Sequence, residues 1–377
     1  MPWKEPTVEA ERWEFVRAVR SEALPMREAC RRFGISPTTG YKWVGRAARE
    51  SEHGLSDAPR TPLSSPMRTV PALEEQVCAV RRAHPRWGGR KIHHVLRRAG
   101  VAEAPAPSTC TGILRRHGLL DAPEREQHAW QRFERPAPNL LWQMDFKGHI
   151  ACGAGRCHPL TILDDHSRFN VCLAACADER LETVRHQLIA TYRRYGLPDA
   201  MLMDNGAPWG SDAHHPHTRL TAWLMRLGVI VSHGAPMHPQ TQGKEERFHR
   251  TLKAEVLTTR PAWYSLDELQ HAFDAWRPVY NYERPHESVG LGVPGDRYAP
   301  SPRAYPEVLP PIAYAPGDVL RKVQDKGRIS FRGRCFRVGR AFVGEPVALR
   351  PTIIDGVWDV YYCAQRVTRL DFTDLQS

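Results

Sequence analysis

Leu140-Leu141-Trp142-Gln143-Met144-Asp145-Phe146 is an apolar, β-type run that carries one carboxylate near its end. Two further acidic residues stand at similar junctions between a regular element and a loop. Asp204 follows an apolar run in Met203-Asp204-Asn205-Gly206, and Glu246 lies near the start of an amphipathic helix after His238-Pro239-Gln240-Thr241-Gln242-Gly243. Three carboxylates held on a rigid scaffold predict a site for divalent cations.

The predicted metal is Mg²⁺, or Mn²⁺ in its place, because Mg²⁺ prefers oxygen ligands and keeps waters and phosphate oxygens in its shell. In two-metal phosphoryl chemistry the ions lie about 3.5–4 Å apart, one activating the attacking oxygen and the other stabilising the leaving oxygen. We expect two ions bridged by Asp145, because residues 140–150 read as the first, central strand. Asp204 and Glu246 would each bind one ion from the side.

The three motifs, in this order, resemble the DDE catalytic core of insertion-sequence transposases, which are related to retroviral integrases. Leu163-Asp164-Asp165-His166-Ser167-Arg168-Phe169 is similar to the family's second-strand signature. Tyr280-Asn281-Tyr282-Glu283-Arg284-Pro285-His286, with Leu291 and Pro294, is similar to its closing motif. The resemblance covers residues 136–300 and implies an α/β RNase H-like core with Asp145, Asp204 and Glu246 as its catalytic residues.

One departure from the family is the 41 residues between Asp204 and Glu246, a longer interval than is usual. We expect the surplus in the polar stretch 209–217, as a surface loop that leaves the geometry of the three carboxylates untouched.

Each acidic residue also has a structural interpretation. Asp-Asn-Gly at 204–206 is a common turn, and Asp164 and Asp165 occupy a hairpin-like position that favours a turn role over metal binding. Glu245 competes with Glu246, but the family pattern selects Glu246, and Glu245 would point about 100° away around the helix.

The helix that carries Glu246 has a cationic side and an apolar side. Phe248, Leu252 and Val256 are predicted to pack on the sheet. The cationic side either grips DNA phosphates or is a solvated basic face. The residues predicted to contact DNA here are Lys244, Arg247, His249, Arg250 and Lys253.

Composition favours a polyanionic partner. The 377 residues carry a net charge of +11, and residues 1–120 hold 21 Lys or Arg against 12 Asp or Glu. The strongest phosphate contacts are therefore predicted in the first third of the chain.

That first third predicts two all-α helix-turn-helix units, each of which is alternatively a generic three-helix core. In the first, helices at 8–19, 26–33 and 37–49 surround the turn Gly34-Ile35-Ser36, with Thr7 and Ser36 as caps. Its last helix would lie in the major groove. It would present Thr38, Thr39, Tyr41, Lys42 and Arg46.

The second unit predicts helices at 72–83, 88–99 and 108–117, with Gly100 ending one helix and Ser108 starting the next. Ile92, Val95 and Leu96 would pack against Val77 and Val80. The cations left for phosphates include Arg90, Lys91, Arg115 and Arg116.

The predicted domain order ends in a small all-β, SH3-like barrel of about five antiparallel strands, which by resemblance implies DNA or protomer contact. The boundaries are: helix-turn-helix 1–50, linker 51–71, second helix-turn-helix 72–122, linker 123–138, catalytic core 139–300, Pro-rich linker 301–317 and barrel 318–377.

The nine cysteines are scattered and mostly sit on apolar segments, so we expect reduced thiols in a cytoplasmic protein, here one associated with the bacterial nucleoid. The sequence has neither a convincing zinc motif nor a membrane-spanning run or signal peptide, so no membrane partner is expected.

The resemblance implies that activated water cuts double-stranded DNA at the element's terminal repeats to expose a 3′-OH, which then attacks target DNA directly. A homo-oligomer on DNA is also implied. Two alternatives stay open: an inactive or regulatory DNA-binding relative, and a nuclease on the same core that cuts without joining.

Overall fold

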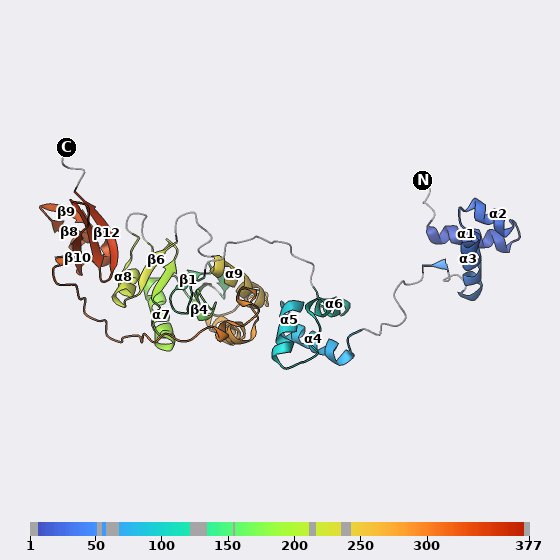
Figure 1. The fold of residues 1–377 in the computed structure, drawn as a ribbon, viewed down its shortest axis with the longest axis horizontal. Helices are drawn as coiled ribbons and strands as arrows, with labels where there is room; N and C mark the ends of the chain where they lie inside the picture. Colours follow the sequence, from blue (N-terminus) through green and yellow to red (C-terminus); the bar gives the residue numbers. More distant parts are fainter. Residues whose placement is uncertain are drawn as a thin grey trace. The chain divides into compact units, whose positions relative to one another are not determined.

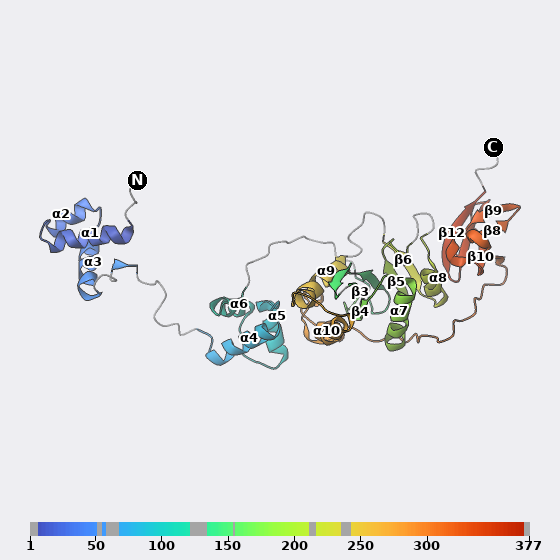
Figure 2. The same ribbon diagram turned by 180° about the vertical axis from the view of Figure 1, so that it is seen from behind.

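The computed structural model describes residues 7–50, 55–57, 68–120, 134–153, 155–210, 216–234 and 243–372. The chain forms two compact units, residues 1–68 and 69–377 (Figures 1 and 2). Within the described residues, no helix is both long and apolar enough to cross a membrane.

The first unit is a three-helix bundle of α1 (Val8–Arg20), α2 (Met26–Arg32) and α3 (Pro37–Glu50) around Phe15, Val16 and Trp43. Thr7 Oγ1 accepts from Ala10 N and Ser36 Oγ accepts from Thr39 N, as the caps predict. A Cβ on Gly40 would lie 2.6 Å from Cys30 Sγ, so α3 approaches α2 this closely because residue 40 is glycine.

Three more helices open the second unit: α4 (Pro71–Ala83), α5 (Gly89–Arg98) and α6 (Pro107–Arg116). Ile92 and Leu96 are buried with Val77, and Val80 and Val95 pack against them, which confirms the predicted apolar contacts. A Cβ on Gly89 would lie 2.4 Å from Pro107 O, so this glycine lets α5 and α6 cross closely.

The central sheet has six strands in the order β2-β3-β1-β5-β6, with β4 paired to β3. β1 runs antiparallel to β3 and parallel to β5. The strands are β1 (Trp142–Phe146), β2 (Ile150–Cys152), β3 (Gly155–Asp164), β4 (Asn170–Cys176), β5 (Ala200–Met203) and β6 (Ile230–His233). The single strand predicted at 140–150 is wrong: β1 ends at Phe146, and the chain turns through Gly148 (φ +79°) into β2, which pairs with the other end of β3.

Helices cover both faces of this sheet (Figure 1). Trp142, Met144 and Ile162 share a core with α7 (Leu181–Tyr195) and α8 (Arg219–Arg226). The alternate strand positions Leu163 and Leu173 share another core with α9 (Gly243–Leu252) and α10 (Leu266–Pro278). Short helical segments follow: η3 (Lys253–Leu257), η4 (Val279–Glu283), η5 (Glu287–Val289) and η6 (Pro294–Asp296). Cys152, Cys157, Cys172 and Cys176 are buried free thiols.

The C-terminal region is all-β, apart from the short helices η7 (Asp325–Gly327) and η8 (Arg340–Phe342). Its strands are β7 (Val319–Lys322), β8 (Arg328–Phe331), β9 (Arg334–Arg337), β10 (Pro346–Pro351), β11 (Val357–Tyr362) and β12 (Gln365–Asp371). Among the described residues the strands pair as a four-stranded sheet, β12-β11-β10-β7, and a β8-β9 hairpin, rather than as one closed sheet.

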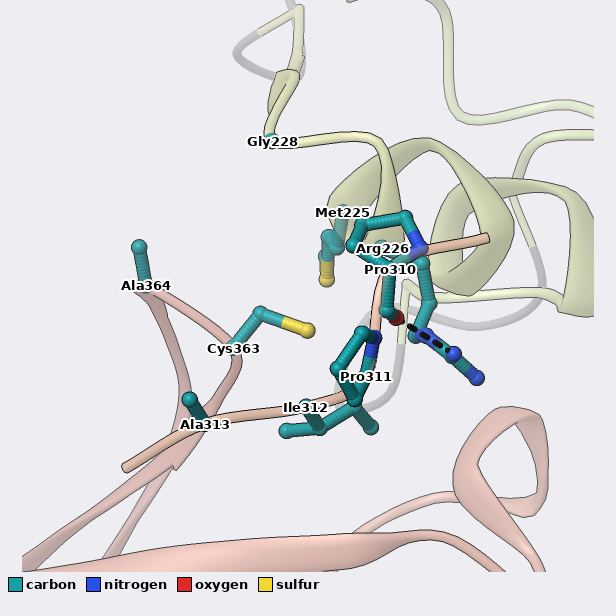
Figure 3. A pocket seen from close by; sticks show the side chains of 9 residues that line it. All are labelled: Met225, Arg226, Gly228, Pro310, Pro311, Ile312, Ala313, Cys363 and Ala364. Carbon is teal, nitrogen blue, oxygen red and sulfur yellow. Dashed lines mark hydrogen bonds between the residues drawn. The ribbon is translucent and has the colours of Figure 1, made fainter. Parts of the chain in front are cut away.

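The Pro-rich segment forms one wall of a small pocket between α8 and the β11–β12 turn (Figure 3). Pro311 and Ile312 line it opposite Cys363, and Arg226 donates a hydrogen bond to Pro310 O at 2.8 Å. As the proline content predicts, this segment is neither helix nor strand.

Candidate active site

Asp145 and Asp204 lie side by side at the C-terminal ends of the neighbouring parallel strands β1 and β5. Gln143 of β1 pairs with Leu202 of β5 in a parallel ladder, so the ends of both strands lie together. The Asp145 side chain is 23% exposed. Burial first, and then the Asp204 carboxylate, raise the pKa of Asp145 to about 7. A buried aspartate whose charge is disfavoured by a neighbouring carboxylate forms a site that a cation would stabilise.

The Asp204 carboxylate is held on one side only. Its Oδ1 accepts from Gly206 N at 2.9 Å and from Trp209 Nε1. Its Oδ2 accepts no hydrogen bond from the described residues and is therefore available to a metal ion.

Trp209 is the residue that sequence reasoning missed. We expected it in a surface loop, but its side chain is 1% exposed and its ring stacks on Phe146 with centroids 5.2 Å apart. The expectation for 209–217 is therefore wrong at Trp209, while 211–215 lie outside the described residues. The sequence does contain a signal for this burial, because a bulky aromatic residue in an otherwise polar stretch often packs into the core.

Glu245 and Glu246 begin α9 with different surroundings. Glu245 is 1% exposed, and its Oε2 lies 2.9 Å from the hydroxyl of Thr161, the strand partner of Asp145. Burial, and then the Asp145 carboxylate, raise the pKa of Glu245 well above its ordinary value. Glu246 is exposed. Solvent therefore reaches Glu246, whereas the Glu245 side chain is buried against Thr161.

The structure does not gather all three predicted ligands. Among the described residues, no three His, Cys, Asp or Glu side chains form a group that could hold a metal ion. Glu246 makes no hydrogen bond or ion pair with those residues, so its side chain can turn without breaking either kind of interaction.

Asp164 and Asp165 hold the β3–β4 turn. Asp164 Oδ1 accepts from the amide and hydroxyl of Ser167. Asp165 is 1% exposed and accepts from Gln143 Nε2, Arg135 N and Lys244 Nζ. Their carboxylate oxygens are thus used inside the fold.

Family models match most of the chain. The integrase core domain matches residues 135–239 and 227–294, and the IS481 family transposase C-terminal domain matches 318–377. A helix-turn-helix domain matches 11–62 and a homeodomain-like domain 39–114. The chain is an insertion-sequence transposase with an integrase core.

Two bacterial relatives agree with this identification. An uncharacterized 39.2 kDa protein of insertion element IS476 from Xanthomonas euvesicatoria is 27% identical over 280 residues, covering 70% of this chain and 74% of that protein. A putative transposase for IS986/IS6110 from Mycobacterium tuberculosis is 24% identical over 274 residues, covering 68% and 92%.

Among solved structures, the simian T-cell lymphotropic virus intasome aligns over 78% of this chain and 99% of its own, with 14% identity and a TM-score of 0.37. The HTLV-2 integrase core in complex with magnesium aligns over 44% and 99%, with 13% identity and a TM-score of 0.34.

On α9 of the transposase, two residues predicted to contact DNA are turned inward. Lys244 forms an ion pair with buried Asp165, and burial lowers its pKa. His249 is 8% exposed, with Nε2 at 2.8 Å from Thr161 Oγ1, and burial lowers its pKa to about 3. The prediction that His249 belongs to the cationic face is therefore wrong. Arg247, Arg250 and Lys253 are exposed.

In the first helix-turn-helix unit, Thr38, Tyr41 and Lys42 are exposed along α3. Thr39 is half-buried, with its hydroxyl at 2.9 Å from Ser36 Oγ. Arg46 donates to Ser56 O at 3.2 Å and lies over the Trp43 ring. Helix α3 thus exposes three of its five predicted residues to solvent.

In the second helix-turn-helix unit, two of the four predicted cations form ion pairs with the protein. Arg90 lies 3.4 Å from Glu287, and Arg116 donates to Glu74 at 2.6 Å. Lys91 is half-buried, and burial lowers its pKa to about 8. Arg115 is exposed.

Proposed function

We propose that the transposase cuts DNA at the ends of a mobile element and joins the exposed 3′-OH to target DNA, with Asp145, Asp204 and Glu246 as ligands of two Mg²⁺ or Mn²⁺ ions. The observation that carries this proposal is the pair of aspartates at one sheet edge. Burial, and then the Asp204 carboxylate, raise the pKa of Asp145, and no described residue donates to Asp204 Oδ2. An all-oxygen donor set of this kind suits a hard divalent cation.

When bound, the ions would activate the attacking oxygen and stabilise the leaving oxygen. The protein's own part is to hold the carboxylates in place. Hydrogen bonds fix Asp204 on its Oδ1 side, and strand pairing with Thr161 fixes the backbone of Asp145. Glu246 would approach from α9, whose His249 Nδ1 lies 4.0 Å from Asp145 Oδ2.

The choice between the two glutamates can be tested with one chemical change at adjacent positions. Glu246→Gln is expected to lower metal-dependent cleavage by on the order of 1,000-fold, because it removes a charged ligand that the ions need. Glu245→Gln keeps the size of a buried group and is expected to retain activity within about tenfold. Cleavage rates on end-labelled DNA measure both. The reverse order would assign the ligand to Glu245.

The domain division is also part of the proposal. Residues 1–50 and 72–122 would read the terminal repeats, 139–300 would catalyse, and 318–377 would act as an SH3-like module contacting DNA or another protomer. The linkers would be 51–71, 123–138 and 301–317. The protein would act as a homo-oligomer on the DNA of the bacterial nucleoid.

The β8–β9 hairpin is the basic surface that supports DNA contact by the C-terminal region. Arg328, Arg332 and Arg334 are exposed. The Arg332 guanidinium lies over the rings of Trp358 at 4.9 Å and Phe331 at 5.6 Å, which pre-orients it for a phosphate.

The double substitution Arg332→Ala and Arg334→Ala is expected to make the fall of log K with log salt less steep, by about 2 in the slope. The reason is that each lost phosphate contact releases about one counterion fewer. Fluorescence anisotropy on duplex DNA at several salt concentrations measures the slope. Arg193→Ala is the control. Arg193 lies on α7, outside the hairpin, and donates two hydrogen bonds to Glu307. An equal slope in the double variant and wild type would remove the hairpin from the interface.

Incubating the protein with labelled DNA that carries the element's flanking repeats, with Mg²⁺ or with EDTA, tests the proposed function. Metal-dependent nicks and joined products are expected. Nicks without joining would indicate a nuclease, and binding without nicks would indicate a regulatory relative.

A further inference from the structure

We infer that Trp209 is a positioning residue for the metal site, which fixes Asp204 as a one-oxygen ligand through the indole N–H. The inference rests on the proposed function, because it concerns how Asp204 would meet a metal ion. It adds a residue outside the three carboxylates and assigns it a specific atom.

The first observation is how the two oxygens of Asp204 differ. Trp209 Nε1 and Gly206 N both donate to Oδ1, and no described residue donates to Oδ2. Two donors on one oxygen prevent the carboxylate from rotating freely and leave the other oxygen to face a cation.

The second observation is that Trp209 also contacts the strand that carries Asp145. Its ring stacks on Phe146, the residue after Asp145, with centroids 5.2 Å apart and planes inclined by 15°. One buried side chain therefore joins the end of β1 to the carboxylate that follows β5. This pair of contacts would hold the Asp204 carboxylate in place beside the end of β1, where Asp145 lies.

The third observation is that the loop is shaped to deliver Trp209 to this place. Gly210 N donates to Gly206 O at 2.6 Å, and Asn205 Nδ2 donates to Gly234 O at 2.9 Å. A Cβ on Gly210 would lie 2.0 Å from Asn205 O, so the loop closes on itself only because residue 210 is glycine.

The substitution Trp209→Phe separates the hydrogen bond to Asp204 from the ring contact with Phe146. Trp209→Phe keeps an aromatic ring against Phe146 and removes the N–H donor. Groups that orient a metal ligand typically contribute 10- to 100-fold to metal affinity, so the dissociation constant for Mn²⁺ is expected to rise by about that factor. Titrating the full chain with Mn²⁺, and following free Mn²⁺ by electron paramagnetic resonance, measures this without DNA or catalysis.

Trp142→Phe is the matched control. Trp142 is also fully buried, and its Nε1 donates to a side-chain oxygen, Asn139 Oδ1, at 3.2 Å. This substitution also removes an indole N–H, here from β1, without touching a carboxylate of the proposed site. Its Mn²⁺ affinity is expected to equal that of the wild type.

Trp209→His, which restores a ring N–H donor, is expected to bind Mn²⁺ more tightly than Trp209→Phe. Thermal melting without metal would reveal whether Trp209→Phe folds poorly. In that case the comparison of Trp209→His with the wild type tests the role of the N–H donor instead. The wild type and Asp204→Asn complete the set.

Unchanged Mn²⁺ affinity in Trp209→Phe, or an equal loss in Trp142→Phe, would overturn the inference while leaving the proposed function intact. Wild-type affinity in Asp204→Asn would instead show that this carboxylate is no ligand, and both the proposed function and the inference would fail.

Discussion

Replacing Asp145 with Asn is expected to lower strand cleavage and joining by on the order of 1,000-fold or more, because it removes the charged ligand proposed to bridge both ions. The amide has nearly the same shape as the carboxylate, and Asp145 also pairs with Thr161 through its backbone. Folding and DNA binding are therefore expected to persist. Product formation on labelled DNA and anisotropy on the same duplex measure the two properties separately.

Asp199→Asn is the control for this change. Asp199 lies just before β5, is half exposed and pairs with Arg303 at 3.1 Å, away from the proposed metal site. It is expected to behave as wild type. Substantial joining by Asp145→Asn would show that the reaction does not need this carboxylate.

Replacing Asp165 with Ala is expected to cause the largest loss of stability, about 3–5 kcal/mol in the free energy of unfolding, because it breaks a buried ion pair from one side. Asp165 is 1% exposed, and its removal deletes the carboxylate that accepts from Lys244 Nζ, Arg135 N and Gln143 Nε2. Urea denaturation followed by circular dichroism measures the change in the core transition.

A second change separates the ion pair from simple packing. Adding Lys244→Met to Asp165→Ala removes the half-buried cation that faced the deleted carboxylate, so the double variant is expected to be more stable than Asp165→Ala alone. If Asp165→Ala unfolds at the wild-type urea concentration, the ion pair is not what holds the first turn of α9.

The features that could be predicted from the sequence depend on local patterns. Helical periodicity and caps predicted the six N-terminal helices, and the Thr7 and Ser36 caps are found where expected. Asp145 and Asp204 each follow an apolar run, and parallel pairing of β1 with β5 brings them to one edge. The turn role of Asp164 and Asp165 followed from their place between two strands.

The features that could not be predicted depend on contacts between distant segments. His249 lies about 40° from Glu245 and about 60° from Glu246 around the helix, so spacing alone could not assign it to the buried face. Lys244 looked like a surface cation because its partner, Asp165, lies 79 residues away in the sequence. Trp209 was hidden in a polar stretch, since only the fold brings Phe146 against it.

The most direct test of the account is a joining assay with DNA that already ends in the element's 3′-OH, a target duplex and Mg²⁺. Wild type, Asp145→Asn, Asp204→Asn and Glu246→Gln would be compared at equal DNA occupancy. Joined product is expected from the wild type alone, and only with the metal present. Joined product that survives the loss of any of the three carboxylates, or a wild type that binds DNA without cutting or joining it, would contradict the account.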